Sequence, residues 1–230
     1  MIIYYYDLDE VVAGDENCNM FVRKALPYLD DERKSKIAKI KPLKNKAMSA
    51  AAGLLIRKGF DDHLCLKEGG HENAAISYEY TEHGKPFIKG YPDFEFSLSH
   101  SGRYAVLAVA DSPVGIDVQE KKTAGDILKV SAHIMSEDEL AALEKENDSA
   151  KKADYFFRIW SAKEAFVKMT GVGLSEKLGD FSCDFKQMEI IGNDGEIRGY
   201  IYEPASFDGY ALSVCSKKKG EQFLLKEVQI

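Results

Sequence analysis

The sequence predicts an α+β protein built from two halves of similar size. Three observations favour this class. A helical pattern followed by strand patterns occurs twice along the 230 residues. Turn-forming segments such as Asn193-Asp194-Gly195 join neighbouring strand patterns, as in hairpins. The regular strand–helix alternation that indicates a parallel sheet is missing.

We place the boundary between the two halves at residues 112 and 113. No low-complexity linker separates residues 1–112 from residues 113–230. Because independent domains are usually joined by such linkers, we expect the two halves to pack as one unit.

The helices of the first half are indicated by a cap and by apolar spacing. Asp30 or Asp31 can cap a basic helix over residues 32–41, because an aspartate side chain accepts from the free N–H groups of a first turn. Small and apolar side chains then recur at helical spacing over residues 44–58. We expect Gly59 to end this second helix.

Four strand patterns place a sheet in the middle of the chain. Residues 2–6 are rich in β-formers, and apolar residues alternate with polar ones from Phe94 to Ser99, the period of a half-buried strand. The uninterrupted apolar run Tyr104–Ala110 predicts a central strand. A further short run, Val114–Val118, predicts its neighbour.

The second half repeats the order of helix and strands. Helical signals cover residues 126–145, and residues 153–170 form the clearest helical pattern of the chain. Strand patterns then occur in pairs around turn sequences, which predicts two hairpins. The pairs are 188–191 with 196–202, around Asn193-Asp194-Gly195, and 210–215 with 223–228, around Lys217-Lys218-Lys219-Gly220.

Composition excludes several classes of function. Hydrophobic residues make up 45% of the chain and charged residues 30%, as in ordinary globular proteins. The formal net charge of −7 argues against general attraction to nucleic acid or to an anionic membrane. No apolar run approaches the ~20 residues that span a bilayer, and the first residues do not form a targeting signal. Four scattered cysteines fit reduced thiols, so we expect a cytoplasmic protein.

The helix over residues 153–170 carries two different faces. One stripe is apolar and predicts contact with the core, whereas the other places Phe157 and Trp160 beside Glu164 and Lys168. An ordinary exposed Glu-x-x-x-Lys pair contributes only ~0.2–0.5 kcal/mol to helix stability. The aromatic neighbours favour a second surface that is buried or faces a ligand.

Asp117 is a second candidate, because it lies among buried β-formers. Its side chain points to the face opposite Val114, Ile116 and Val118. A buried carboxylate requires a partner, since an unpaired buried charge is costly. Asp117 and Glu164 together could hold Mg²⁺, which prefers oxygen ligands. A salt bridge from Asp117 to a lysine of the helix, Lys163 or Lys168, is the open alternative.

The segment from Phe96 to Gly102 does not indicate a serine hydrolase. Neighbouring strand residues point to opposite faces, so Ser99 and His100 cannot form a nucleophile–base pair with each other, and no G-x-S-x-G motif occurs. His100 and Ser99 could instead donate hydrogen bonds to an anion. The basic stretch that contains Arg33 and Lys36 could add cations for a polyphosphate, or be a solvated helix face.

Taken together, these motifs resemble the 4'-phosphopantetheinyl transferases of the surfactin-synthetase-activating type, over nearly the full length of the chain. Their order and separations make the match specific. The matching segments are Gly84-Lys85-Pro86, Phe96-Ser97-Leu98-Ser99-His100-Ser101-Gly102, Gly115-Ile116-Asp117, Trp160-Ser161-Ala162-Lys163-Glu164-Ala165-Phe166-Val167-Lys168 and Gly171-Val172-Gly173-Leu174.

The resemblance implies a fold, a reaction and partners. It implies a monomer of two pseudo-symmetric α+β halves, with coenzyme A and Mg²⁺ in the cleft between them. The metal-binding and catalytic residues belong to the C-terminal half. The implied reaction moves the phosphopantetheine arm of coenzyme A onto a serine of an apo acyl or peptidyl carrier protein and releases 3',5'-ADP.

The resemblance also implies roles for individual residues. Asp117 and Glu164 match metal ligands, Glu164 also matches the general base, and Lys168 matches the cation beside the pyrophosphate. His100 is expected near the 3'-phosphate of coenzyme A. The full expected set of cofactor-binding residues is Arg33, Lys36, Lys85, Pro86, Ser99, His100, Asp117, Lys163 and Lys168.

Two positions depart from the family pattern. Gln119 stands where the family often has a second metal-binding carboxylate, and Met48 stands where a helix often carries an arginine. Lys44 or Lys46 could replace that arginine.

Two other functions stay open at this point. One is a non-catalytic module that binds coenzyme A or a carrier protein. The other is a different Mg²⁺-dependent phosphotransferase, although the glycine-rich phosphate loops typical of such enzymes do not occur.

Overall fold

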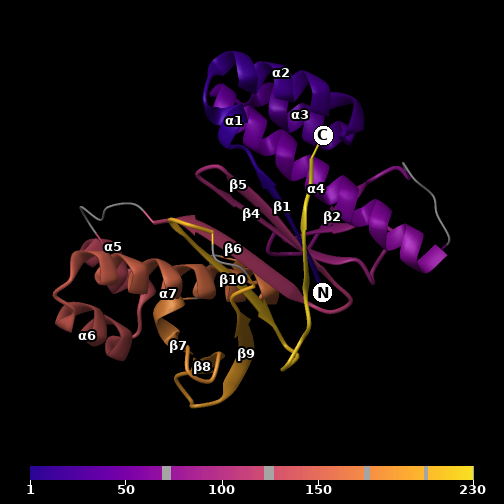
Figure 1. Ribbon diagram of the computed structural model, residues 1–230. Helices are drawn as coiled ribbons and strands as arrows, with labels where there is room; N and C mark the ends of the chain where they lie inside the picture. The colour runs from indigo at the N-terminus through magenta and orange to yellow at the C-terminus, as the bar shows by residue number, and fades with distance from the viewer. Residues whose placement is uncertain (69–73, 122–126, 174–176, 205–206, 230) are drawn as a thin grey trace.

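The computed structural model describes residues 1–68, 74–121, 127–173, 177–204 and 207–229. It confirms the α+β class, with helices and antiparallel strands in both halves (Figure 1). The first half contains β1 (Ile2–Asp7), α1 (Asp9–Val12), α2 (Asp15–Ala25), η1 (Leu26–Tyr28), α3 (Asp31–Lys39), α4 (Leu43–Glu68), β2 (Tyr78–Tyr80), β3 (Pro86–Ile88), β4 (Glu95–Ser101) and β5 (Tyr104–Ala110). The second half contains β6 (Val114–Glu120), α5 (Ile127–Ile134), α6 (Glu137–Lys145), α7 (Ser149–Thr170), η3 (Leu178–Asp180), β7 (Phe181–Asp184), β8 (Glu189–Gly192), β9 (Ile197–Tyr202), β10 (Tyr210–Ser216) and β11 (Leu224–Glu227).

The two main sheets repeat one arrangement. In the sheet ordered β11-β1-β5-β4, the first strand of the first half pairs antiparallel with β5, and β4 follows. In the sheet ordered β6-β10-β9-β8-β7, the first strand of the second half pairs antiparallel with β10, and β9 follows. The long helix α4 packs on the first sheet and α7 on the second (Figure 1). The halves are therefore related by pseudo-symmetry.

Strand β5 is buried because it lies between α4 and the second sheet. Leu107 and Val109 belong to the core under α4. Val106 and Ala108, which point the other way, pack with Ile116 and other residues of the second sheet. A strand covered on both faces needs apolar side chains at every position, and this explains the uninterrupted apolar run.

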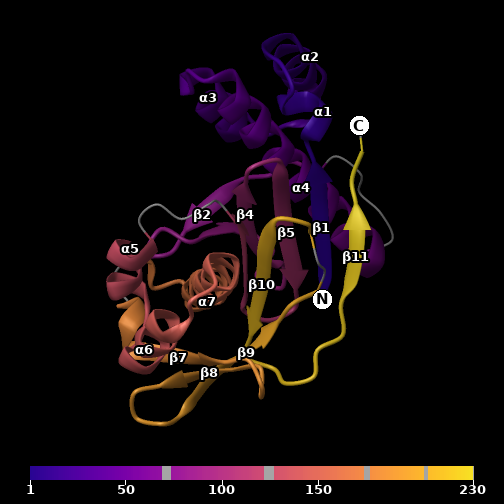
Figure 2. The same cartoon turned by 60° about the vertical axis from the view of Figure 1, so that its left-hand side comes forward.

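The expected hairpin between residues 210 and 228 is wrong. Strand β10 already pairs with β6 on one edge and with β9 on the other, so no edge is free for the next strand. The chain instead crosses to the first sheet, where β11 lies parallel to β1 with Ile2 opposite Leu224 (Figure 2). The last strand thus ties the second half to the first, across the boundary expected at residues 112 and 113.

Two helices also differ from the expectation. Helix α4 continues through Gly59 to Glu68, so this glycine does not end the helix. It instead allows α4 to pack closely on β5, because a Cβ at Gly59 would come within 2.9 Å of Leu107 Cδ2. The helix expected over residues 126–145 is divided into α5 and α6 by a capping box at Ser136 and Glu139. Residue 126 lies outside the described residues, as does Leu174 of the last family motif.

The sequence patterns did not predict α1 and α2, which cover the outer side of α4. None of the helices that the structure describes is both long and apolar enough to cross a membrane.

Candidate functional site

The candidate site is a cleft of two adjoining cavities between the halves. Cavities of about 520 and 420 Å³ share Arg33, Lys36 and Leu98 in their walls, and volumes of this order are typical of small-molecule sites. The larger cavity extends to Glu164 and Lys168 on α7. Cations from the N-terminal half thus face a carboxylate and a lysine from the C-terminal half.

Gly115 allows α7 to lie directly on β6. A Cβ at this position would lie 1.8 Å from the carbonyl oxygen of Ala165 and 2.5 Å from the backbone nitrogen of Met169. No larger residue fits without moving the helix. This contact brings Glu164 and Lys168 of α7 next to Asp117 of β6.

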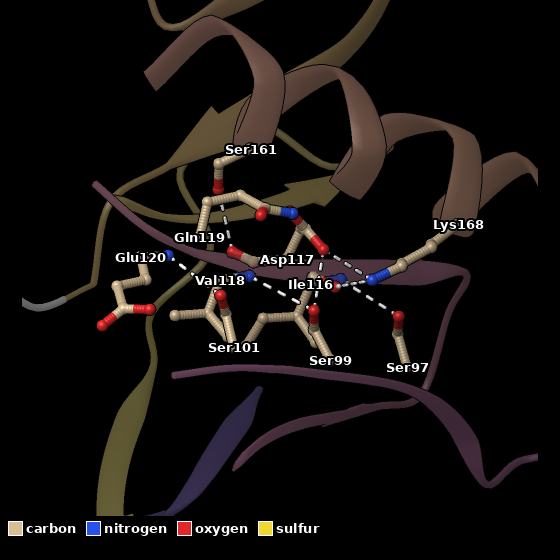
Figure 3. A network of polar contacts seen from close by, with 10 residues as sticks. All are labelled: Ser97, Ser99, Ser101, Ile116, Asp117, Val118, Gln119, Glu120, Ser161 and Lys168. Carbon is tan, nitrogen blue, oxygen red and sulfur yellow. Dashed lines mark hydrogen bonds and ion pairs between the residues drawn. The ribbon is translucent and has the colours of Figure 1, made fainter. Parts of the chain in front are cut away.

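Asp117 is buried at 2% exposure and is held by side chains from three elements (Figure 3). Lys168 Nζ donates to Asp117 Oδ1 at 2.7 Å, and Ser99 Oγ donates to the same oxygen at 2.7 Å. Gln119 Nε2 donates to Asp117 Oδ2 at 2.8 Å. Of the two lysines left open by the sequence, Lys168 is therefore the partner of Asp117.

Glu164 combines partial burial with access to the larger cavity. Burial raises the pKa of its carboxyl group, and the nearby charge of Asp117 raises it further. Lys168 and a hydrogen bond from Trp160 act in the opposite direction, and the net pKa shift is upward. A carboxylate with a raised pKa accepts a proton more readily than an ordinary one, which suits a general base.

Ser99 and His100 point to opposite sides of β4, as the period of a strand requires. The exposed His100 lines the smaller cavity with Arg33 and Lys36. Desolvation of the imidazole ring by the surrounding protein lowers the pKa of His100, and repulsion from Lys168, Lys36 and Arg33 lowers it further. Ser99 is only 7% exposed, and its hydroxyl faces β6. The structure therefore does not bring the Ser99 hydroxyl to the cleft.

Lys163 also lies away from the cleft, contrary to its expected place at coenzyme A. Its side chain is fully buried, and its Nζ lies 2.6 Å from the Glu139 carboxylate. The same nitrogen donates to three backbone carbonyls at 2.6–2.9 Å, so its donors are already used. Lys163 directly precedes Glu164 on α7. Because successive side chains of a helix are turned by about 100°, the two point in different directions. The contacts of Lys163 join α7 to α5, α6, η3 and β7, and we do not assign it to a ligand.

Lys85 and Pro86 line the larger cavity at the point where both halves meet. Lys85 Nζ lies 3.2 Å from Glu95 and 3.4 Å from the carbonyl oxygen of Met169, at the end of α7. Gly171 caps that end with a φ of 74°. A Cβ there would approach Lys85 Cδ to 3.1 Å, so the glycine leaves room for the lysine.

Arg33 and Lys36 project from α3, whose position is set by two contacts. Asp30 caps the helix by accepting from the Arg33 N–H at 2.7 Å, as the sequence predicts. Gly53 of α4 lies so close that a Cβ would be 2.9 Å from Arg33 Cγ. The short helix α3 therefore holds its cations at the cleft rather than in free solvent.

The structure places Met48 and the two lysines that could replace the expected arginine. Met48 is buried in the N-terminal core, yet it also borders the smaller cavity. Lys44, one turn earlier on α4, lines the same cavity, and Lys46 is not among the residues that line either cavity.

Sequence reasoning placed Lys85 and Pro86, at the start of β3, in the site, but it did not identify β2 or its two tyrosines. The hydroxyl of Tyr78 donates to Asp30 at 3.2 Å, and the hydroxyl of Tyr80 donates to Glu32. Both tyrosines line the larger cavity and connect it to α3. The alternation Tyr78-Glu79-Tyr80 was the available signal, but the segment lies in a polar stretch that reads as a loop.

Asp117 and Glu164 are the candidate ligands for a metal ion. In the described part of the chain, no group of three or more His, Cys, Asp or Glu side chains could hold a metal. Asp117 lies close enough to raise the pKa of Glu164, and the amide of Gln119 adjoins Asp117. Glu164 lines the larger cavity, whereas Asp117 lies buried behind it. A pair of carboxylates is compatible with Mg²⁺, which commonly uses one or two carboxylates together with water and substrate phosphates.

Comparisons with known proteins cover both halves of the chain. Residues 113–215 match the family model described as the 4'-phosphopantetheinyl transferase superfamily, and residues 18–112 match the model described as 4'-phosphopantetheinyl transferase, N-terminal. A 4'-phosphopantetheinyl transferase of Bacillus subtilis is 30% identical over 219 residues, which cover 94% of this chain and 92% of that protein. One of Bacillus pumilus is 31% identical over 89% of this chain and 85% of that protein. An L-aminoadipate-semialdehyde dehydrogenase-phosphopantetheinyl transferase of Xenopus laevis is 32% identical over 69% of this chain and 55% of that protein.

Proposed function

The chain belongs to the 4'-phosphopantetheinyl transferase superfamily, and from this premise we propose how it acts on its substrates. The proposed reaction moves the 4'-phosphopantetheine arm of coenzyme A to a serine of an apo acyl or peptidyl carrier protein. The serine oxygen forms a bond to the β-phosphorus, and the bond from that phosphorus to the bridging oxygen breaks. The bond electrons leave with 3',5'-ADP, and the serine proton goes to a base.

Glu164 is the proposed base. Its access to the larger cavity and its raised pKa support this role, because a base must reach the substrate proton and must hold it. Lys168 lines the same cavity and is proposed to stabilise negative charge on the pyrophosphate. Its bond to Asp117 holds the ammonium group near Glu164 without further ordering of the side chain.

Mg²⁺ is the proposed metal, with Asp117 and Glu164 as its protein ligands. Bound there, it would supply positive charge to the pyrophosphate oxygens. The two carboxylates and the open cavity support this choice over metals that prefer nitrogen or sulfur ligands. Gln119 can offer only a neutral amide oxygen.

Coenzyme A is proposed to lie along both cavities. Arg33, Lys36 and His100 surround the smaller cavity and are assigned to the 3'-phosphate, with Lys44 in place of the usual arginine. Lys85 and Pro86 are assigned to the wall of the larger cavity, next to the pyrophosphate. Ser99 and Lys163 are not included, because their polar atoms bond inside the protein.

The proposal includes a monomer in the cytoplasm. Both sides of the cleft come from one chain, so a second copy is not needed to complete the site. All four cysteines are free, as expected in a reducing compartment.

The observation that carries the proposal is the meeting of Asp117, Glu164 and Lys168 at a cleft lined by cations. The test is mass spectrometry of an apo carrier protein incubated with the protein, coenzyme A and Mg²⁺. We expect the carrier to gain the mass of phosphopantetheine. We expect no mass gain when a chelator is present during the reaction, and a restored gain when excess Mg²⁺ is then added. No gain with any of several acyl and peptidyl carriers would instead indicate a binding module.

A further inference from the structure

A row of serines next to Asp117 joins the two main sheets (Figure 3). Strand β4 carries serine at alternate positions, so their hydroxyls share the face that is turned toward β6. Each hydroxyl accepts a hydrogen bond from a backbone N–H of β6. The bonds run from Ile116 to Ser97 at 3.0 Å, from Val118 to Ser99 at 3.3 Å and from Glu120 to Ser101 at 3.0 Å.

We call this row the serine ladder. It takes the place of the backbone hydrogen bonds that would otherwise join two neighbouring edge strands. β4 ends the first sheet and β6 ends the second. The alternate N–H groups of an edge strand need acceptors, and buried ones cannot rely on water. The serines of β4 supply them from the other half of the chain.

Ser99 differs from the other two serines in what it donates to. A hydroxyl has one donor and two acceptor positions, and Ser99 accepts from Val118 while it donates to Asp117 Oδ1 at 2.7 Å. Because one lone pair of Ser99 is engaged by β6, its proton is directed at the carboxylate. No hydrogen bond joins Asp117 to Ser97 or Ser101 among the described residues, so these two are matched controls.

Asp117 therefore receives one of its bonds from the other half of the protein. Gln119 and Lys168 belong to the C-terminal half, as Asp117 does, whereas Ser99 belongs to the N-terminal half. Rotation of the Asp117 carboxylate would break its hydrogen bond with Ser99, which crosses the seam between the halves, that is, the contact of β4 with β6. Its orientation thus depends on how the two halves dock.

We propose that Ser99 is a positioning residue, which orients the Asp117 carboxylate across the seam between the halves. This role rests on the proposed function, in which Asp117 binds Mg²⁺. Ser99 acts through Asp117 and does not touch the substrate. The sheet contact that joins the halves then also sets the affinity of the metal site.

The test compares Ser99→Ala with Ser97→Ala and Ser101→Ala. Each variant loses one bond of the serine ladder, and only Ser99→Ala loses the bond to Asp117. The first readout is Mg²⁺ affinity, measured by calorimetric titration in the presence of coenzyme A and the absence of carrier. The second is the split between kcat and the KM for coenzyme A, and the third is the thermal unfolding midpoint.

We expect Ser99→Ala to weaken Mg²⁺ binding by about 10-fold or more, the usual effect of losing a partner that orients a metal ligand. Its kcat at fixed Mg²⁺ falls, and its KM for coenzyme A stays near that of the parent. The control variants lose a comparable amount of stability and keep the parent's Mg²⁺ affinity. Ser99→Thr, which retains the hydroxyl, restores the affinity. If Ser99→Ala does not fold, Ser99→Cys keeps the volume with a weak donor and is expected to show the same loss.

Two outcomes separate this role from the proposed function. If the parent binds Mg²⁺ and transfers phosphopantetheine while Ser99→Ala keeps the parent's Mg²⁺ affinity, the positioning role is overturned and Ser99 only joins the strands. If the parent neither binds Mg²⁺ nor transfers, the proposed function fails, and the role of Ser99 fails with it.

Discussion

The two sides of the cleft hold their charged groups in different ways. On the N-terminal side, Lys36 and His100 are exposed at the rim of the smaller cavity. On the C-terminal side, Asp117 is buried, and hydrogen bonds from both halves fix both of its oxygens. Charges at an open rim can follow a flexible anion, whereas a buried and bonded carboxylate is already oriented for chemistry. The difference supports the proposal in which the first side binds coenzyme A and the second performs the transfer.

The largest expected effect is on the C-terminal side. Glu164→Gln keeps the volume of the side chain but removes its ability to take a proton and removes one negative charge from the proposed metal site. We expect kcat to fall about 10²–10⁴-fold, the usual contribution of a general base. The measurement is the initial rate of carrier modification at saturating coenzyme A. Retention of most activity would place the base elsewhere and remove the distinction between the two sides.

A second test moves the C-terminal side as a unit. Gly115→Ala places a Cβ 1.8 Å from the Ala165 carbonyl oxygen, so α7 must shift and carry Glu164 and Lys168 away from Asp117. We expect a loss of about 1–3 kcal/mol or more in the free energy of unfolding, the cost typical of overpacking, together with a lower kcat. Gly14→Ala is the control, because nothing lies within 4 Å of its Cβ position. Equal stability of the two variants would contradict the close packing.

His100→Ala tests the N-terminal side by comparing coenzyme A with dephospho-coenzyme A. A charge-assisted bond to the 3'-phosphate contributes about 1.5–3 kcal/mol. We therefore expect weaker binding of coenzyme A, little change for dephospho-coenzyme A, and a nearly unchanged kcat. Equal losses for the two ligands would show that His100 does not contact that phosphate.

The same contact predicts a pH dependence. The pKa of His100 in the free protein lies below its usual range, and a bound phosphate dianion raises it, because it favours the charged imidazole. The extra affinity is thus complete below the free-state pKa and is lost as pH rises through the bound-state pKa. We expect coenzyme A affinity to fall between about pH 6 and pH 8, where histidine titrates. The parent's affinity for dephospho-coenzyme A and the affinity of His100→Ala for coenzyme A serve as flat controls.

The smallest expected effect is at Gln119, which now donates to Asp117 Oδ2. In Gln119→Glu, a like charge replaces that donor. Without Mg²⁺ we expect a lower unfolding midpoint than in the parent. With Mg²⁺ we expect a steeper rise of the midpoint, because a ligand that binds only the folded state stabilises it. The exposed Gln187→Glu adds the same charge away from the site, and a similar Mg²⁺ response in both variants would exclude Gln119 from the metal environment.

The sequence predicted those features whose cause is local. The cap of α3 at Asp30 and the opposite directions of Ser99 and His100 follow from neighbouring residues and from strand geometry. The apolar run Tyr104–Ala110 predicted a central strand, and β5 lies between β1 and β4 in the first sheet. Each of these properties is settled within a few residues of chain.

Features that depend on distant partners were not predictable. A strand pattern at residues 223–228 does not say which edge it will join, and β11 joins the sheet of the other half. The alternation along β4 does not say which of its faces meets the ligand, and so Ser99 was placed at coenzyme A. Helical spacing alone could have predicted that Lys163 and Glu164 point in different directions. It could not have predicted the partner of Lys163, because Glu139 lies on another helix.

The most direct test of the division between the two sides measures binding and chemistry separately. Coenzyme A is bound first to Glu164→Gln or to His100→Ala, its affinity is measured by calorimetry, and single-turnover transfer to an apo carrier follows at saturating coenzyme A. The account predicts that, without Mg²⁺, Glu164→Gln binds coenzyme A nearly as the parent does, and that at saturating Mg²⁺ and coenzyme A it transfers very slowly. It predicts that His100→Ala binds weakly and, once saturated, transfers at nearly the parent's rate. The reverse pattern, or equal losses of binding and transfer in both variants, would contradict it.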